Sequence, residues 1–127
     1  MDQPKPKLKL FELAKRVSLK SPSRFKLGCI LVDKSRVVSV GFNNMHKSHP
    51  KIKTYGNFIH AETHCLLGLS YQETKGKTLY VYRADRWGNT ANSKPCPVCY
   101  ETMKIAGIKH LFYSIKGDVY GYENLWK

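Results

Sequence analysis

His60-Ala61-Glu62 and Pro95-Cys96-Pro97-Val98-Cys99 are the two stretches on which the interpretation of this chain depends. Together they supply one imidazole, two thiols and one carboxylate. An imidazole and two thiolates give a tetrahedral zinc ion three protein ligands and leave its fourth position for water, whereas a structural zinc site uses four protein ligands. The two stretches therefore predict a zinc centre that activates water, with His60, Cys96 and Cys99 as its ligands.

Glu62 separates a catalytic zinc site from a structural one. A carboxylate two residues after the histidine is not needed as a ligand. It can instead accept a proton from the zinc-activated water and pass it on, provided that it lies within hydrogen-bond reach. We expect Glu62 to be the catalytic proton shuttle. His64 is a rival ligand, because histidines four residues apart on a helix can share a metal, but Ala61 stands where that motif requires a glutamate, so we interpret His64 as structural.

Length and composition, with 42% apolar residues, indicate one globular domain over residues 1–127, and the two motifs predict that this domain is zinc-dependent. No apolar run is long enough to cross a membrane, and the basic N-terminus lacks the apolar segment of a secretory signal, so we expect a cytoplasmic protein. The net charge of +13 favours a polyanionic partner or a phosphorylated substrate. The alternative is a basic surface that only aids solubility.

The four cysteines fall into two groups. Cys29 and Cys65 stand beside apolar residues and are interpreted as small buried side chains. Cys96 and Cys99 have the two-residue gap of a metal or redox pair. Because they fall in the first turn of a predicted helix, we expect the helix N-terminus to lower their pKa and favour thiolates.

The apolar periodicity predicts an α/β fold in which helices flank a mixed sheet. The segment after residue 116 is too short for the crossover that a parallel strand needs, so any strand there must form an antiparallel hairpin with the one before it. The prediction is a sheet of four to five strands. The predicted helices are 8–19, 60–69 and 95–106, and the predicted strands are 27–32, 37–42, 78–82, 108–115 and 119–122.

Two loops are candidates for substrate binding. The loop over residues 45–59 combines several basic residues with Tyr55 and Phe58, a combination that can grip phosphates and stack on bases. The polar loop over residues 83–93 contains Trp87, which either flanks the pocket or packs under its own loop.

The two motifs and the order of elements resemble the cytidine deaminase superfamily, whose zinc-dependent members deaminate nucleobases. The resemblance covers nearly the whole domain and implies a three-layer α/β/α fold and Zn²⁺ as the cofactor. Gly41-Phe42-Asn43 resembles the end of the second strand in some branches, which implies a sugar or base contact for Asn43. It also implies that the Ala61 backbone hydrogen-bonds the base. Since members range from monomers to tetramers, an oligomer is compatible with it.

The function implied is hydrolytic conversion of cytosine to uracil in a nucleotide or in single-stranded DNA or RNA. The hairpin at the end of the chain and the long loop before Pro95 favour cytosine over adenine, although an adenosine deaminase acting on RNA uses the same chemistry. A non-catalytic zinc module that binds nucleic acid is a second alternative, in which Glu62 is dispensable. A thiol redox domain built on Cys96 and Cys99 leaves His60 and Glu62 unexplained.

Overall fold

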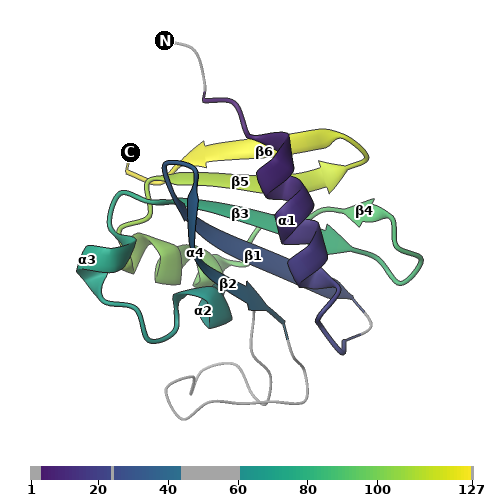
Figure 1. Ribbon diagram of the computed structural model, residues 1–127, viewed down its shortest axis with the longest axis horizontal. Helices are drawn as coiled ribbons and strands as arrows, with labels where there is room; N and C mark the ends of the chain where they lie inside the picture. Colours follow the sequence, from purple (N-terminus) through teal and green to yellow (C-terminus); the bar gives the residue numbers. More distant parts are fainter. Residues whose placement is uncertain (1–3, 24, 44–60, 127) are drawn as a thin grey trace.

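The secondary structure follows the apolar periodicity of the sequence, and Figure 1 shows its arrangement. The computed structural model describes residues 4–23, 25–43 and 61–126. In these ranges no helix has the length and apolarity needed to cross a membrane. The helices are α1 (Leu8–Ser18), α2 (Ala61–Leu66), α3 (Tyr71–Thr74) and α4 (Pro97–Ile105). The strands are β1 (Lys26–Asp33), β2 (Arg36–Phe42), β3 (Thr78–Ala84), β4 (Thr90–Ala91), β5 (His110–Lys116) and β6 (Val119–Asn124).

The strands form one mixed sheet in the order β2-β1-β3-β5-β6, with β4 paired to β3. β3 and β5 are parallel because α4 carries the chain back across the sheet, and the other pairs are antiparallel. At the tight β1–β2 turn Lys34 takes a left-handed backbone conformation with φ of 62°. The antiparallel β5–β6 hairpin confirms the prediction for the end of the chain.

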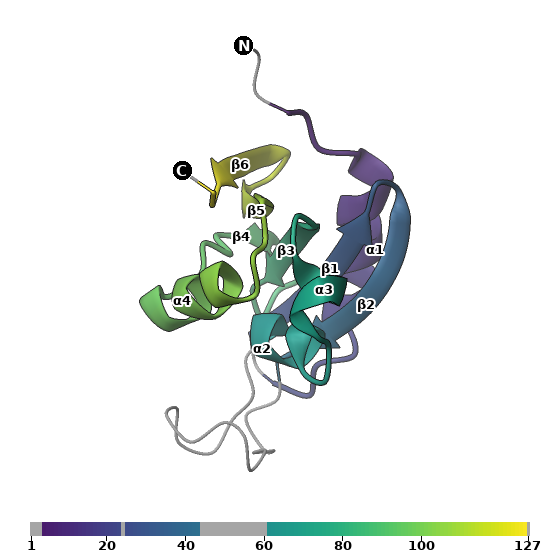
Figure 2. The same cartoon turned by 90° about the vertical axis from the view of Figure 1, so that its left-hand side faces the viewer.

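Side chains alternate between the two faces of the sheet, and each face is buried under helices. In β1, Cys29 and Leu31 pack in the core on the α2 and α4 side, whereas Ile30 and Val32 pack against α1. β3 and β5 alternate in the same way. Figures 1 and 2 show α1 on one face and α2, α3 and α4 on the other. The three-layer α/β/α fold is therefore confirmed, as is the burial of Cys29 and Cys65.

The predicted helices and strands are present, with ends that differ by a few residues. Two short elements differ from the sequence-based prediction. α3 is a single turn that begins with a capping box between Ser70 and Glu73. β4 lies inside the segment that was predicted to be a loop, and its pairing with Arg83 and Ala84 adds a sixth strand to the four or five expected. Two residues carry too little periodicity to predict a strand.

Two glycines let helices approach the sheet closely. A Cβ on Gly41 would lie 2.3 Å from the backbone nitrogen of Cys65 and 2.6 Å from the carbonyl oxygen of Ala61, both in α2. A Cβ on Gly28 would lie 2.2 Å from the carbonyl oxygen of Ala14 in α1, on the opposite face. Real side chains do not tolerate such distances. Gly41 therefore sets the position of α2, the helix that carries Glu62.

Candidate active site

A cavity of about 250 Å³ lies on the α2 and α4 side of the sheet, near the end of β3. Its wall combines β1, β3, the first residues of α2 and the segment that leads into α4. The lining residues are Leu27, Asn43, Ala61, Glu62, Arg83, Asn92, Ser93, Lys94, Pro95 and Cys96. The fold thus brings Ala61 and Glu62 of the first motif and Pro95 and Cys96 of the second to one cavity.

Glu62 lies in the first turn of α2, and only 3% of it is exposed. Burial raises the pKa of its carboxyl group, while hydrogen bonds from its own backbone N–H and from the Cys99 thiol act in the opposite direction. A buried carboxyl group with a raised pKa, lining a cavity, is typical of a group that exchanges protons. It hydrogen-bonds a cysteine from the second motif, so the two motifs are in direct contact.

Cys96 and Cys99 belong to the start of α4. Cys96 is its N-cap residue and lines the cavity, and Cys99 is buried two residues into the helix. Burial, followed by the charge of Glu62, raises the pKa of the Cys99 thiol far above its usual range. The expectation that the helix N-terminus would lower this pKa is therefore wrong for Cys99. Desolvation and a neighbouring carboxylate outweigh the helix dipole here.

The donor set at this position fits a divalent cation. Cys96 and Cys99 are neighbouring thiols beside the Glu62 carboxyl group, and the charge of Glu62 and the contact with Cys96 both add to the burial that raises the pKa of Cys99. A bound cation reverses that balance, because it stabilises the thiolates that coordinate it. No three such side chains of residues 4–23, 25–43 and 61–126 are close enough to form a complete metal site. The third predicted ligand, His60, lies outside the described residues.

Asn43 lines the cavity, but backbone groups occupy much of its hydrogen-bonding capacity. Its Oδ1 accepts from the backbone N–H of Leu27 at 2.9 Å, and its Nδ2 donates to the carbonyl oxygen of Phe25 at 2.9 Å. These bonds hold the entry to β1 against the end of β2. A substrate contact by Asn43 remains a prediction, and it would use the second Nδ2 hydrogen.

Two buried serines, Ser93 and Ser114, hold the part of the cavity wall that precedes Pro95, and the sequence analysis missed both. Ser93 Oγ donates to the carbonyl oxygen of Val81 at 3.0 Å, and its backbone N–H donates to the carbonyl oxygen of Ser114 at 2.8 Å. Ser114 Oγ lies 2.9 Å from both Ser93 Oγ and the Ala91 carbonyl oxygen. These bonds tie the segment before Pro95 to β3 and β5. The only signal in the sequence is a serine at an inward-facing position of the predicted strand 108–115.

The remaining predicted site residues have different outcomes. The Trp87 side chain is 71% exposed, contacts Arg86 at 4.3 Å, and is not among the residues lining the cavity. It neither flanks the described cavity nor packs under its loop. Tyr55 and Phe58 lie outside the described residues. His64 Nδ1 accepts from the backbone N–H of Phe42 at 3.1 Å, a contact that joins α2 to β2 and suits a structural histidine.

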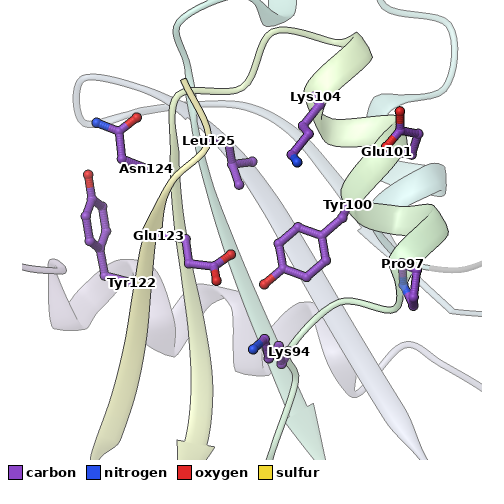
Figure 3. Close-up of a pocket in the computed structure, with 9 residues that line it drawn as sticks. All are labelled: Lys94, Pro97, Tyr100, Glu101, Lys104, Tyr122, Glu123, Asn124 and Leu125. Carbon is purple, nitrogen blue, oxygen red and sulfur yellow. The ribbon is translucent and has the colours of Figure 1, made fainter. Parts of the chain in front are cut away.

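A larger hollow, of about 730 Å³, lies between α4 and β6 (Figure 3). Its polar lining includes the ammonium groups of Lys94 and Lys104 and the carboxylates of Glu101 and Glu123. The Tyr100 hydroxyl points toward the Glu123 carboxylate (Figure 3), and burial, followed by that carboxylate, raises the pKa of Tyr100. Lys94 lines both this hollow and the smaller cavity. Charges of both signs give a polyanion little net attraction to the larger hollow.

Residues 4–115 match the sequence model of a family described as the cytidine and deoxycytidylate deaminase zinc-binding region. The chain belongs to this family. Because the matched region is the zinc-binding region of these deaminases, the cofactor is Zn²⁺. The thiol pair beside Glu62 agrees with this assignment. A search of curated protein sequences gave no match.

Solved structures of cytidine and deoxycytidylate deaminases share the fold. A cytidine deaminase from Burkholderia pseudomallei is 20% identical with a TM-score of 0.68, and the match covers 95% of this chain and 94% of that one. A dCMP deaminase from the cyanophage S-TIM5, solved with dCMP and dUMP, is 23% identical with a TM-score of 0.59, covering 87% and 83%. A cytidine deaminase from Mycobacterium tuberculosis is 21% identical with a TM-score of 0.55, covering 88% and 91%.

Removing either thiol of the Cys96/Cys99 pair is expected to remove the zinc. Cys96→Ala and Cys99→Ala should each lose bound zinc on dialysis, because a site with two protein ligands left holds the ion weakly. Atomic emission spectroscopy measures the metal content. Cys65→Ala is the matched control, since Cys65 is also a buried thiol but contacts the Ser39 carbonyl oxygen at 3.6 Å. Full zinc content in Cys99→Ala would contradict its assignment as a ligand.

Proposed function

We propose that the protein is a zinc-dependent hydrolytic deaminase that converts the cytosine base of a nucleoside or nucleotide to uracil. The observation that carries the proposal is the buried Glu62 carboxyl, which lines the 250 Å³ cavity and hydrogen-bonds Cys99. A zinc site without a catalytic role has no need of a buried, costly carboxyl group beside its thiolates. Membership of the deaminase family supports the same reaction.

The proposed reaction needs an activated water and a group that moves protons. Cys96, Cys99 and His60 would hold the zinc, which would supply the first by lowering the pKa of a water molecule toward neutrality. The water oxygen forms a bond to C4 of cytosine, a proton is added at N3, and the C4–N4 bond then breaks to release ammonia. Glu62 would take one proton from the water and deliver it to N3, and would then take the second proton, from the hydroxyl formed on C4, and deliver it to the amino nitrogen, which leaves as ammonia.

The environment of Glu62 suits this exchange. Burial raises the pKa of its carboxyl group above its ordinary value, in the direction of the working pH. Donation from the Cys99 thiol limits that rise. The group can therefore accept a proton in one step and return it in the next.

The cavity also offers groups that can hold the base. The Ala61 backbone lies beside Glu62, and the second Nδ2 hydrogen of Asn43, which has no acceptor within the part of the chain that the structure describes, would donate to a sugar or base oxygen. Leu27 and Pro95 supply apolar surface for the ring. Apolar walls with few polar groups are typical of pockets for small ligands.

The substrate class is tested by offering the zinc-loaded protein cytidine, CMP, dCMP, adenosine and short single-stranded DNA and RNA. Ammonia release and the conversion of cytosine to uracil are measured in parallel. We expect turnover of a free cytosine nucleoside or nucleotide. Turnover of adenosine alone would show that the substrate base is adenine and not cytosine. Absence of any turnover by fully zinc-loaded protein would favour the non-catalytic zinc module.

A further inference from the structure

Arg83 brings a positive charge into the active-site cavity. It lies near the end of β3, on the face shared with Leu79 and Val81, and it pairs with Leu27 across the sheet. Arg83, Leu27 and Glu62 all line the same cavity. The sequence analysis did not single out Arg83, because it stands at the border between a predicted strand and a predicted loop.

The hydrogen-bonding capacity of Arg83 is largely unused. Its guanidinium stacks on the Phe25 ring at 4.8 Å, and its NH1 donates to the carbonyl oxygen of Asn92 at 3.4 Å, a long bond. Its Nε is buried and has no hydrogen-bond partner among the residues that the structure describes. A buried, unpartnered guanidinium N–H is unfavourable unless a ligand or water satisfies it. The side chain is thus held in place by Phe25 and Asn92 while donors remain for another group.

No carboxylate neutralises this charge in the described ranges of the chain. The ion pair within 4 Å among those residues joins Lys77 and Asp33, at the other end of the sheet. Arg83 and Glu62 line one cavity, and among the residues that the structure describes they form no ion pair with each other. Lys94, an exposed lysine without a described acidic partner, adds a second positive charge to the same lining. The cavity therefore has a carboxyl group at one position and a cationic rim at another.

We propose that Arg83, assisted by Lys94, binds the phosphate attached to the sugar of the target cytosine, so that the preferred substrate is a nucleotide. This inference rests on the proposed deaminase function and deepens it. A guanidinium in a fixed orientation is the group best suited to phosphate, because it presents parallel N–H donors to two phosphate oxygens. Because Arg83 and Glu62 line one cavity without forming an ion pair, the base would lie at Glu62 and the phosphate at Arg83.

A purely structural role for Arg83 makes a different prediction. If the stacking of Arg83 on Phe25 only stabilises the cavity wall, replacing Arg83 should lower kcat/KM for cytidine and for CMP by the same factor. If it binds phosphate, Arg83→Gln should lower kcat/KM for CMP by about 10- to 100-fold, as expected for loss of a charge-assisted hydrogen bond, and leave kcat/KM for cytidine nearly unchanged. Arg83→Lys keeps the charge but not the paired donors, so its kcat/KM for CMP should lie between those of the wild type and Arg83→Gln.

The control is Arg36→Gln, which removes the same charge from the exposed β1–β2 turn, at the far end of that hairpin from the cavity. It should leave the ratio of CMP to cytidine efficiency unchanged. Circular dichroism and thermal unfolding of each variant identify folded protein, and Arg83→Lys serves if Arg83→Gln fails to fold. Parallel losses for both substrates in the folded Arg83 variants would overturn the proposal.

Binding provides a readout that does not depend on turnover. Calorimetry on Glu62→Gln protein should show tighter binding of CMP than of cytidine, weaker CMP binding in salt, and loss of the difference when Arg83→Gln is added. Equal affinity for CMP and cytidine in the Arg83-containing protein would overturn the inference. If CMP binding depends on Arg83 but the wild type does not turn CMP over, the phosphate site is supported and the proposed deaminase function is rejected.

Two sources can supply the phosphate, and the same assay separates them. The target cytosine can belong to a mononucleotide or to a single strand, where a phosphodiester replaces the monoester. We expect the binding of CMP to depend on Arg83. Arg83-dependent binding of a single-stranded oligonucleotide, with none for CMP, would support the phosphate site and identify the strand as its source.

Discussion

Glu62→Gln is expected to lower kcat by about 10²- to 10⁴-fold for the preferred cytosine substrate, which is the contribution of a well-placed general acid–base group. Glutamine has nearly the same shape as glutamate, so the cavity wall and the contact with Cys99 should remain, but glutamine cannot carry a proton between water and base. Zinc content and the circular dichroism spectrum should be unchanged. Steady-state kinetics and metal analysis of the same preparation measure the two properties.

The matched control for this exchange is Glu123→Gln. Glu123 is partly buried and lies beside Tyr100 in the larger hollow between α4 and β6 (Figure 3), and it does not line the cavity that contains Glu62. Its replacement should leave kcat within a few-fold of wild type. Wild-type activity in Glu62→Gln, with zinc bound, would reject Glu62 as the proton shuttle and favour the non-catalytic zinc module.

Glu62→Gln should also change how the stability of zinc-depleted protein depends on pH. Burial raises the native pKa of the Glu62 carboxyl above its ordinary 4.5, so the native state holds this proton more tightly than the unfolded state. The resulting stability is complete below the ordinary pKa and is lost as pH rises through the raised native pKa. Urea denaturation should show that, as pH rises over that interval, the free energy of unfolding of Glu62→Gln increases relative to that of the wild type. An advantage of glutamine that shrinks with rising pH would contradict the raised pKa.

Gly41→Ala is expected to destabilise the protein by about 3 kcal/mol, the upper part of the range for overpacking a well-packed site. The new methyl group would lie 2.3 Å from the Cys65 nitrogen and 2.6 Å from the Ala61 oxygen, so α2 must move away from β2. Because α2 carries Glu62, the folded fraction should also lose activity. Chemical denaturation gives the free energy of unfolding, and kcat per bound zinc gives the activity of the folded molecules.

Gly28→Ala separates the two effects. Its methyl group would clash with α1 at Ala14 and Ser18, on the face of the sheet opposite to the cavity. A similar loss of stability is expected, but folded Gly28→Ala should keep nearly wild-type kcat. Equal kcat per zinc in the two variants would show that the contact of Gly41 with α2 does not position Glu62.

The local patterns of the sequence determined most of the architecture. The apolar runs in 27–32, 78–82 and 108–115 predicted strands. Because side chains in a strand point alternately to either side, such runs place apolar residues on both faces of the sheet. An antiparallel hairpin was predicted for the segment after β5, and the β5–β6 pair has that arrangement. The zinc motif is equally local, because the two-residue gap brings Cys96 and Cys99 to the same turn of α4.

Tertiary structure alone decided what surrounds the motif. The contact between Glu62 and Cys99, the tie between Ser93 and Ser114, and the placement of Arg83 in the cavity join residues that are distant in sequence. No local pattern encodes these distances. The pKa of Cys99 shows the physical reason most clearly. From sequence, the helix start predicted a lowered value, but burial and the Glu62 charge depend on which elements pack together, and they raise it.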